Sequence, residues 1–140
     1  MKTILALFVA SLLISSSCNK DNEGDCPGDI VCTQDFRSIH VQIMNGSAPY
    51  QLDNYITKRH SDSMVIDIRS VIGSYADSMY RANGNYPILT DAQMQLTSRH
   101  GTGFTFIGYL NNREVIRENF VIAHDCCHIS KVSGRDQVNL

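Results

Sequence analysis

The residues with the most reactive side chains gather near the two ends of the sequence. Among them, the run His124-Asp125-Cys126-Cys127-His128 places five potential metal ligands in succession. If this run is a regular strand, His124, Cys126 and His128 share one face. Two histidines and one thiolate are the ligands of a copper site, or three of the four ligands of a zinc site. The run therefore allows a metal-binding or redox function.

The N-terminus predicts export. Residues 1–17 have the form of a signal peptide, with Lys2, an apolar segment of about 11 residues and three serines. That apolar segment is too short to cross a bilayer as a helix. The run Ile14-Ser15-Ser16-Ser17-Cys18 resembles a bacterial lipobox, in which the cysteine receives lipid and becomes the first mature residue. Ser15 stands where the commonest lipobox has Leu, as in looser lipoboxes of Bacteroidota-type lipoproteins.

The segment Cys18-Asn19-Lys20-Asp21-Asn22-Glu23-Gly24-Asp25 extends this resemblance. It is similar to the acidic export signal that sends such lipoproteins to the outer face of the outer membrane. The resemblance implies a covalent lipid on Cys18, localisation on the outer membrane with surface exposure, and the membrane as a partner. Residues 18–35 would then be a lipidated tether and N-terminal loop, and several acyl chains would anchor it stably.

Export makes disulfides the preferred fate of the other four cysteines, which are Cys26, Cys32, Cys126 and Cys127. A bridge between the adjacent Cys126 and Cys127 would close a strained eight-membered ring. We therefore expect each of them to pair with Cys26 or Cys32, closing loops of about 95 to 100 residues. Same-face strand residues are about 6.5 Å apart and converge poorly on one ion, so the metal site is the alternative.

Short segments of alternating apolar and polar residues, separated by turn residues, predict about seven strands in a domain over residues 36–134. The expected strands are 37–43, 50–59, 64–68, 86–90, 103–110, 114–123 and 128–134. Asn111 and Asn112 predict a hairpin turn between two of them, and Pro87 predicts an edge strand. Residues 71–81 fit either a helix or an irregular crossover, 91–100 allow one helical turn, and 135–140 form a polar tail.

This pattern, with no alternation of strands and helices, predicts an all-β fold, an antiparallel Greek-key β-sandwich. The order of strands, with a long hairpin near the end, resembles the transthyretin-like or carboxypeptidase-regulatory-like sandwiches. The segment from Phe120 to Gly134 also resembles the ending of uncharacterised small Bacteroidota lipoproteins. An immunoglobulin-like topology is the second choice, because the sequence has no Trp for the usual Cys-Trp-Cys core.

Composition and motifs point away from nucleic acid and from catalysis. The formal charge of −2 provides no basic surface for a phosphate backbone. The sequence has no nucleophile elbow, phosphate loop or zinc-protease helix, so a non-enzymatic module without a cofactor is predicted. Carboxylates that could pair in space are Asp62, Asp67, Asp77, Asp91 and Asp125.

Tyrosines are the main recognition candidates, because a tyrosine combines a large apolar surface with a polar tip. Tyr75, Tyr80 and Tyr86 surround the least regular segment, so they are the predicted contacts for a protein or glycan partner. Ser63 and Ser78 lie in Asp-Ser-Met triplets that resemble the O-glycosylation sites of Bacteroidota proteins. Neither feature identifies a ligand.

Overall fold

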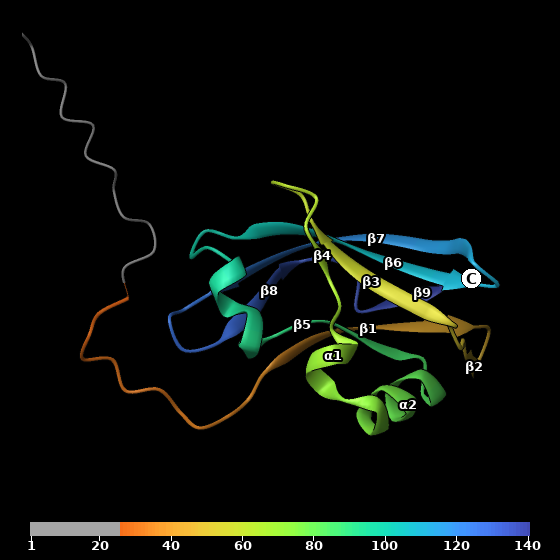
Figure 1. Ribbon diagram of the computed structural model, residues 1–140, viewed down its shortest axis with the longest axis horizontal. Helices are drawn as coiled ribbons and strands as arrows, with labels where there is room; N and C mark the ends of the chain where they lie inside the picture. Colours follow the sequence, from red (N-terminus) through yellow and green to blue (C-terminus); the bar gives the residue numbers. More distant parts are fainter. Residues whose placement is uncertain (1–25) are drawn as a thin grey trace, which may run out of the picture.

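The structure, a computed structural model, describes residues 26–140, which form two β-sheets packed face to face (Figure 1). The prediction of an all-β sandwich is confirmed, with nine strands in the described part of the chain rather than seven. Cys18 and the predicted signal peptide lie outside the described residues. Between Cys26 and the C-terminus, no helix is long and apolar enough to cross a membrane.

The smaller sheet is built around strand β1. This strand pairs antiparallel with β2 and β5 and parallel with β9. Strand β5 pairs only with β1 among the described strands, which agrees with the edge position that Pro87 predicts. The four strands are β1 (Ser38–Asn45), β2 (Ala48–Pro49), β5 (Asn85–Thr90) and β9 (Gln137–Asn139).

The larger sheet has the strand order β4-β3-β6-β7-β8, and every pairing in it is antiparallel. Its centre is the hairpin of β6 and β7, whose turn residues Asn111 and Asn112 have φ of 51° and 59°. Asparagine tolerates this left-handed conformation, so the predicted hairpin is confirmed. The five strands are β3 (Asn54–Arg59), β4 (Val65–Ile66), β6 (Thr102–Leu110), β7 (Arg113–His124) and β8 (Ile129–Ser133).

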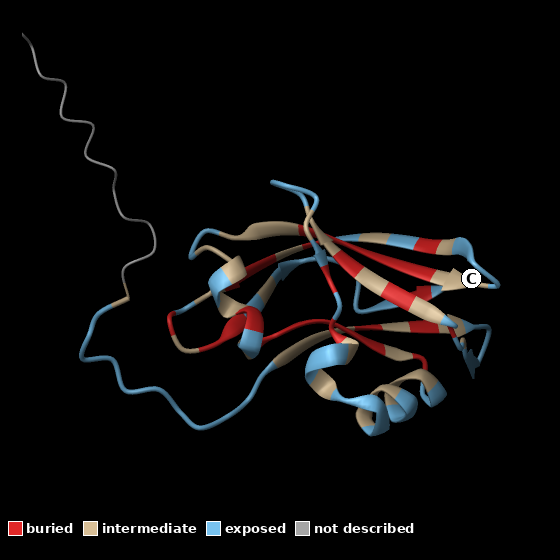
Figure 2. Ribbon diagram, in the orientation of Figure 1, coloured by how far each residue is buried: buried red, intermediate tan, exposed pale blue. Residues whose placement is uncertain are grey.

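The core lies between the two sheets, and strands of both sheets carry buried residues that face it (Figure 2). Three aromatic rings from three strands meet there: the ring centroid of Tyr55 lies 5.1 Å from that of Tyr86 and 5.9 Å from that of Phe106. Thr57 is also buried, and its hydroxyl donates to the carbonyl of Ile88 across the sheets at 2.8 Å. These contacts fix the position of one sheet on the other.

The segment after β3 differs from the predicted strand over residues 64–68. Only Val65 and Ile66 pair with β3, and the chain then forms two short helices, α1 (Arg69–Ile72) and α2 (Ser74–Ala82). Gly73 separates them with a φ of 80°, a conformation that glycine adopts without steric cost. The segment 71–81 is therefore helical, with one break at the glycine. The Tyr55 hydroxyl, which donates to Asp77 Oδ1 at 2.6 Å, holds α2 to the sheet.

The C-terminal residues correct the prediction of a polar tail. Residues 137–139 form β9, which runs parallel to β1 and places Val138 in the core with 5% of its surface exposed. The sandwich therefore continues to the end of the chain. The apolar side chain of Val138 alone is too weak a signal to predict a strand. The strand forms because β1 offers backbone groups for these residues to pair with.

Replacing Val138 with Ala is expected to lower the free energy of unfolding by about 2 kcal/mol, because two buried carbons are lost and a cavity remains. The matched control is Gln137→Ala in the same strand, since Gln137 is exposed. It should change the stability by less than about 0.5 kcal/mol. Denaturant unfolding of the two variants measures the difference. Equal stabilities would show that β9 contributes no packing.

Candidate functional site

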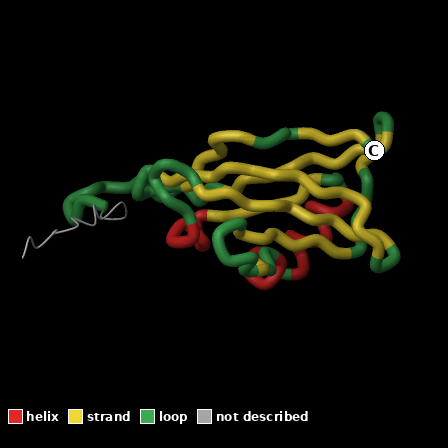
Figure 3. The backbone as a smooth tube through the Cα atoms, turned by 90° about the horizontal axis from the view of Figure 1, so that it is seen from above, coloured by secondary structure: helices red, strands yellow, loops and turns green. Residues whose placement is uncertain are grey.

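The candidate site lies at the end of the sandwich where residues 26–35 join it (Figure 3). Strand β7 ends at His124 and β8 begins at Ile129, so the residues between them form a turn. Asp125 organises this turn, since its Oδ1 accepts the backbone N–H groups of Cys127 at 2.9 Å and His128 at 2.8 Å. These two hydrogen bonds, His128 first, hold the pKa of Asp125 below its usual value.

Two disulfides fasten the N-terminal loop to this turn. Cys26 is bonded to Cys126 and Cys32 to Cys127, with Cα–Cα distances of 5.5 and 5.3 Å. The prediction that each of the adjacent cysteines pairs with one N-terminal cysteine is confirmed. Cys126 has a φ of 80°, which is rare for a residue other than glycine. This conformation lets two successive residues serve two separate bridges.

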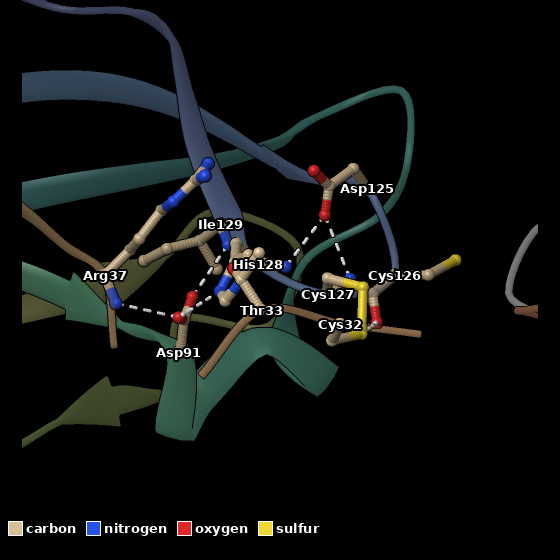
Figure 4. A network of polar contacts seen from close by, with 9 residues as sticks. All are labelled: Cys32, Thr33, Arg37, Asp91, Asp125, Cys126, Cys127, His128 and Ile129. Carbon is tan, nitrogen blue, oxygen red and sulfur yellow. Dashed lines mark hydrogen bonds and ion pairs between the residues drawn. A yellow bond between two sulfur atoms is a disulfide. The ribbon is translucent and has the colours of Figure 1, made fainter. Parts of the chain in front are cut away.

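A network centred on Asp91 joins the same segments (Figure 4). Asp91 is the first residue of the 3-10 helix η1 (Asp91–Leu96). Its Oδ2 accepts from the backbone N–H of Arg37 and contacts His128 Nδ1, and its Oδ1 accepts from the N–H of Ile129, all at 2.8 Å. His128 Nε2 lies 2.8 Å from the hydroxyl of Thr33. One carboxylate thus connects the N-terminal loop, η1 and β8.

The balance of forces on Asp91 keeps it charged. Its side chain is 12% exposed. Burial raises the pKa of Asp91, but the hydrogen bonds from Arg37, His128 and Ile129 lower it by more, so the pKa lies below its usual value. The carboxylate is therefore ionised at neutral pH, and it accepts hydrogen bonds from three donors at the edge of the core.

The order hydroxyl, imidazole, carboxylate in Thr33, His128 and Asp91 is also that of nucleophilic hydrolases. Here the carboxylate shares its oxygens with two backbone N–H groups, and the His128 side chain is 6% exposed. Neither of the cavities described below is lined by Thr33 or His128. The arrangement joins the N-terminal loop, η1 and the residue before β8.

The predicted metal set of His124, Cys126 and His128 does not come together. That set assumed a regular strand, but the turn at Asp125 ends the alternation of faces, and His128 is directed to Asp91. In its place, ligand atoms of Cys26, His124 and Cys126 lie within 4.8 Å of one another. His124 Nδ1 accepts the backbone N–H of Cys126 at 3.1 Å, which orients this ring.

Two cavities open near this end of the sandwich. One, of about 360 Å³, lies beside the Cys26–Cys126 bridge and is lined by Cys26, Asp91, Met94, Gln95, Thr97 and His124. The other, of about 590 Å³, is bordered by Arg59, His60 and Gly103 and by residues of the 95–102 segment. Two of the polar side chains bordering the larger cavity are already engaged, since Arg59 pairs with Asp62 and His60 Nε2 lies 2.8 Å from the Thr105 hydroxyl.

The three predicted tyrosine contacts are placed in three different environments. Tyr86 is fully buried, and its hydroxyl accepts from Leu52 N–H at 2.7 Å and donates to the Tyr50 carbonyl at 2.8 Å. The expectation that it contacts a ligand is therefore wrong, because its ring lies on the inward face of β5 and packs in the core. Tyr80 is half-buried, with its ring 4.8 Å from that of His40. Tyr75 alone is fully open, with 80% of its surface exposed.

The predicted modification sites differ in backbone context. Ser63 is exposed at a turn, with a φ of 59°. Ser78 is exposed on α2, where its hydroxyl donates to the carbonyl of Tyr75 at 2.8 Å. Ser63 therefore lies in an exposed turn, whereas Ser78 lies within a helix. Both remain predictions, as does lipidation of Cys18.

Sequence reasoning missed the central role of Asp91 and the participation of Thr33. A signal for Asp91 was present in Thr90-Asp91-Ala92-Gln93, a helix-start pattern. In the structure the Gln93 side chain accepts from the backbone N–H of Thr90 at 3.1 Å, and this starts η1 at Asp91. No pattern in the sequence connects Asp91 with His128, which is 37 residues away.

Comparison with known proteins gives no relative for this chain: no family model, curated protein or solved structure matches it.

Proposed function

We propose that this chain is a lipid-anchored, non-enzymatic module of the bacterial outer membrane that holds a β-sandwich at the cell surface. The observation that carries the proposal is the position of the two disulfides. They join residues 26 and 32, which follow the predicted lipidation site at Cys18, to the turn between β7 and β8. A tether attached in this way leads to one end of the sandwich.

The length of the tether limits how far the domain can lie from the membrane. Cys26 lies eight positions after Cys18, so eight Cα–Cα steps connect them. At 3.3–3.6 Å per residue, they span at most about 29 Å. The turn between β7 and β8 would therefore stay within one domain diameter of the lipid headgroups, and the opposite end of the strands would point outward.

The partner is proposed to be a protein or a glycan that contacts the crossover helices. Val71, Tyr75 and Met79 recur at intervals of four residues along α1 and α2, and 43%, 80% and 49% of their surfaces are exposed. Exposed aromatic and Met side chains are enriched where proteins bind one another, so a protein is the first choice.

The proposed fold type is a Greek-key, transthyretin-like sandwich. The strand order supports it, since β3 and β6 are neighbours although β4 and β5 lie between them in sequence.

The test of the anchor is metabolic labelling with an alkyne fatty acid in a bacterium that makes outer-membrane lipoproteins. The intact chain should incorporate the label and partition into detergent. The Cys18→Ser variant should lose both properties and leave the membrane fraction. The control is Cys26→Ser/Cys126→Ser, which should keep the label. Retention of label by the Cys18→Ser variant would refute lipidation at this residue. A separate experiment tests surface exposure: protease added to intact cells should release the labelled chain from them.

A further inference from the structure

We propose that Cys26, Cys126 and His124 form a zinc-binding site when the bridge between the two cysteines is reduced. The ligand atoms of these residues lie within 4.8 Å of one another. Bond lengths of about 2.3 Å to sulfur and 2.0–2.1 Å to nitrogen place the donors of a tetrahedral zinc site about 3.5–3.8 Å apart. Opening the bridge therefore lets the two sulfurs separate to this spacing, and the imidazole has to approach them by about 1 Å. This inference is independent of the lipid anchor.

The surroundings favour a thiophilic cation. Two thiolates and one imidazole are soft or borderline donors, the set that selects zinc or copper(I) over magnesium or calcium. The cavity of about 360 Å³ is lined by Cys26 and His124, which gives a cation a path to the site. Met94 lines the same cavity. Three protein donors leave a fourth position for water, as in zinc sites that are open on one side.

Contacts outside the two bridges still hold the N-terminal loop at this end of the sandwich after reduction. The Thr33 hydroxyl lies 2.8 Å from His128 Nε2, and the backbone N–H of Arg37 donates to Asp91 Oδ2 at 2.8 Å. The backbone N–H of Cys126 donates to His124 Nδ1, so this nitrogen gives up that hydrogen bond when it binds zinc. The fold therefore brings the three donors together, and both the sulfur–sulfur bond and this hydrogen bond have to open before zinc binds.

The chemistry balances with an external dithiol as the reductant. The dithiol gives two electrons and two protons, its own sulfurs close a disulfide, and the Cys26–Cys126 bond opens into two thiols. Zinc then binds both sulfurs and releases the two thiol protons, which makes the affinity dependent on pH.

The test is a zinc titration of the full chain carrying Cys18→Ser in detergent, with a chromophoric zinc chelator as competitor, before and after reduction by a dithiol that is then removed without air. The oxidised chain is expected to bind no zinc at this site, and the reduced chain one ion. Cobalt substituted for zinc should give sulfur-to-cobalt charge-transfer absorption and the d–d bands of a tetrahedral site.

Variants separate this site from binding by unrelated thiols. Cys26→Ser/Cys126→Ser should abolish the tight binding, and Cys32→Ser/Cys127→Ser should retain one zinc and the cobalt spectrum. His124→Ala should weaken zinc binding by at least about 10- to 100-fold, the effect seen when even an outer partner of a metal site is removed. His60→Ala, in an exposed histidine away from the bridge, should leave the affinity unchanged.

Thermal unfolding of each variant without metal shows that it is folded before zinc is added. Equal zinc binding by the oxidised and reduced chains would overturn the proposal. Loss of binding in Cys32→Ser/Cys127→Ser but not in Cys26→Ser/Cys126→Ser would also overturn it, and so would an unchanged affinity in His124→Ala.

Discussion

Removing both disulfides is expected to destabilise the protein by more than twice the effect of removing either one. The two bridges close almost the same loop, since their partners are 100 and 95 residues apart. While one bridge remains, the other only closes a small ring of about nine residues, worth about 2.5 kcal/mol in the chain-entropy model. Losing both also opens the long loop, for a total of about 7 kcal/mol.

Denaturant unfolding of Cys26→Ser/Cys126→Ser, Cys32→Ser/Cys127→Ser and the fourfold variant, each made with Cys18→Ser, measures this difference. The two paired variants should each lose about 2.5 kcal/mol, and the fourfold variant should be largely unfolded at 37 °C. Additive losses in the fourfold variant would contradict the shared-loop explanation. A much larger loss in one paired variant would instead mean that its bridge holds local structure that the other cannot.

Asp91→Ala is expected to be the most destabilising single substitution at the candidate site. It leaves the N–H groups of Arg37 and Ile129 and the His128 ring without their shared acceptor. Each hydrogen bond to a charged group contributes about 1.5–3 kcal/mol to stability when its loss leaves a buried donor without an acceptor. Water can partly replace the acceptor here, so we expect a total loss of about 3–4 kcal/mol in the free energy of unfolding. The matched control is Asp53→Ala, which removes one bond to the Asn111 N–H at an exposed site and should cost about 1 kcal/mol.

The same residue has a defined pH dependence. Its pKa in the folded protein lies below the usual value, so its contribution is complete above the unfolded pKa near 4 and is lost as the pH falls through the lower folded pKa. The stability advantage of the wild type over Asp91→Asn should therefore shrink on acidification from pH 5 to pH 2. Unfolding curves across this range measure it, and an advantage that stays constant would show that the carboxylate charge is not used.

Local signals predicted the parts of the fold that depend on a few neighbouring residues. The Asn111-Asn112 pair specified the turn of the β6–β7 hairpin, because few residues accept two left-handed positions in succession. The adjacency of Cys126 and Cys127 limited the disulfides to cross-pairing with the N-terminal loop. The compositional pattern of short strands was sufficient for an all-β sandwich, but it left open whether residues 71–81 form a helix or an irregular crossover.

Contacts between distant residues were beyond the sequence. Whether Tyr86 faces a ligand or the core depends on which side of β5 meets the other sheet, and the alternation pattern alone does not decide this. The expected metal set failed because Asp125 caps a turn and stops the strand at His124. Val138 joined the core only because β1 offered an unpaired edge to a short tail.

The position of the bridges also determines how the molecule responds to force. A pull on the chain before Cys26 reaches the turn between β7 and β8 through covalent bonds, not through the hydrogen bonds of β1. Load applied to the chain before Cys26 would therefore bypass residues 38–45 and reach the end of β7, which pairs with β6 along the longest hairpin of the larger sheet. With the bridges reduced, the same pull would reach β1 and its pairings with β5 and β9 first. The oxidation state of the bridges would thus decide which sheet takes up the load.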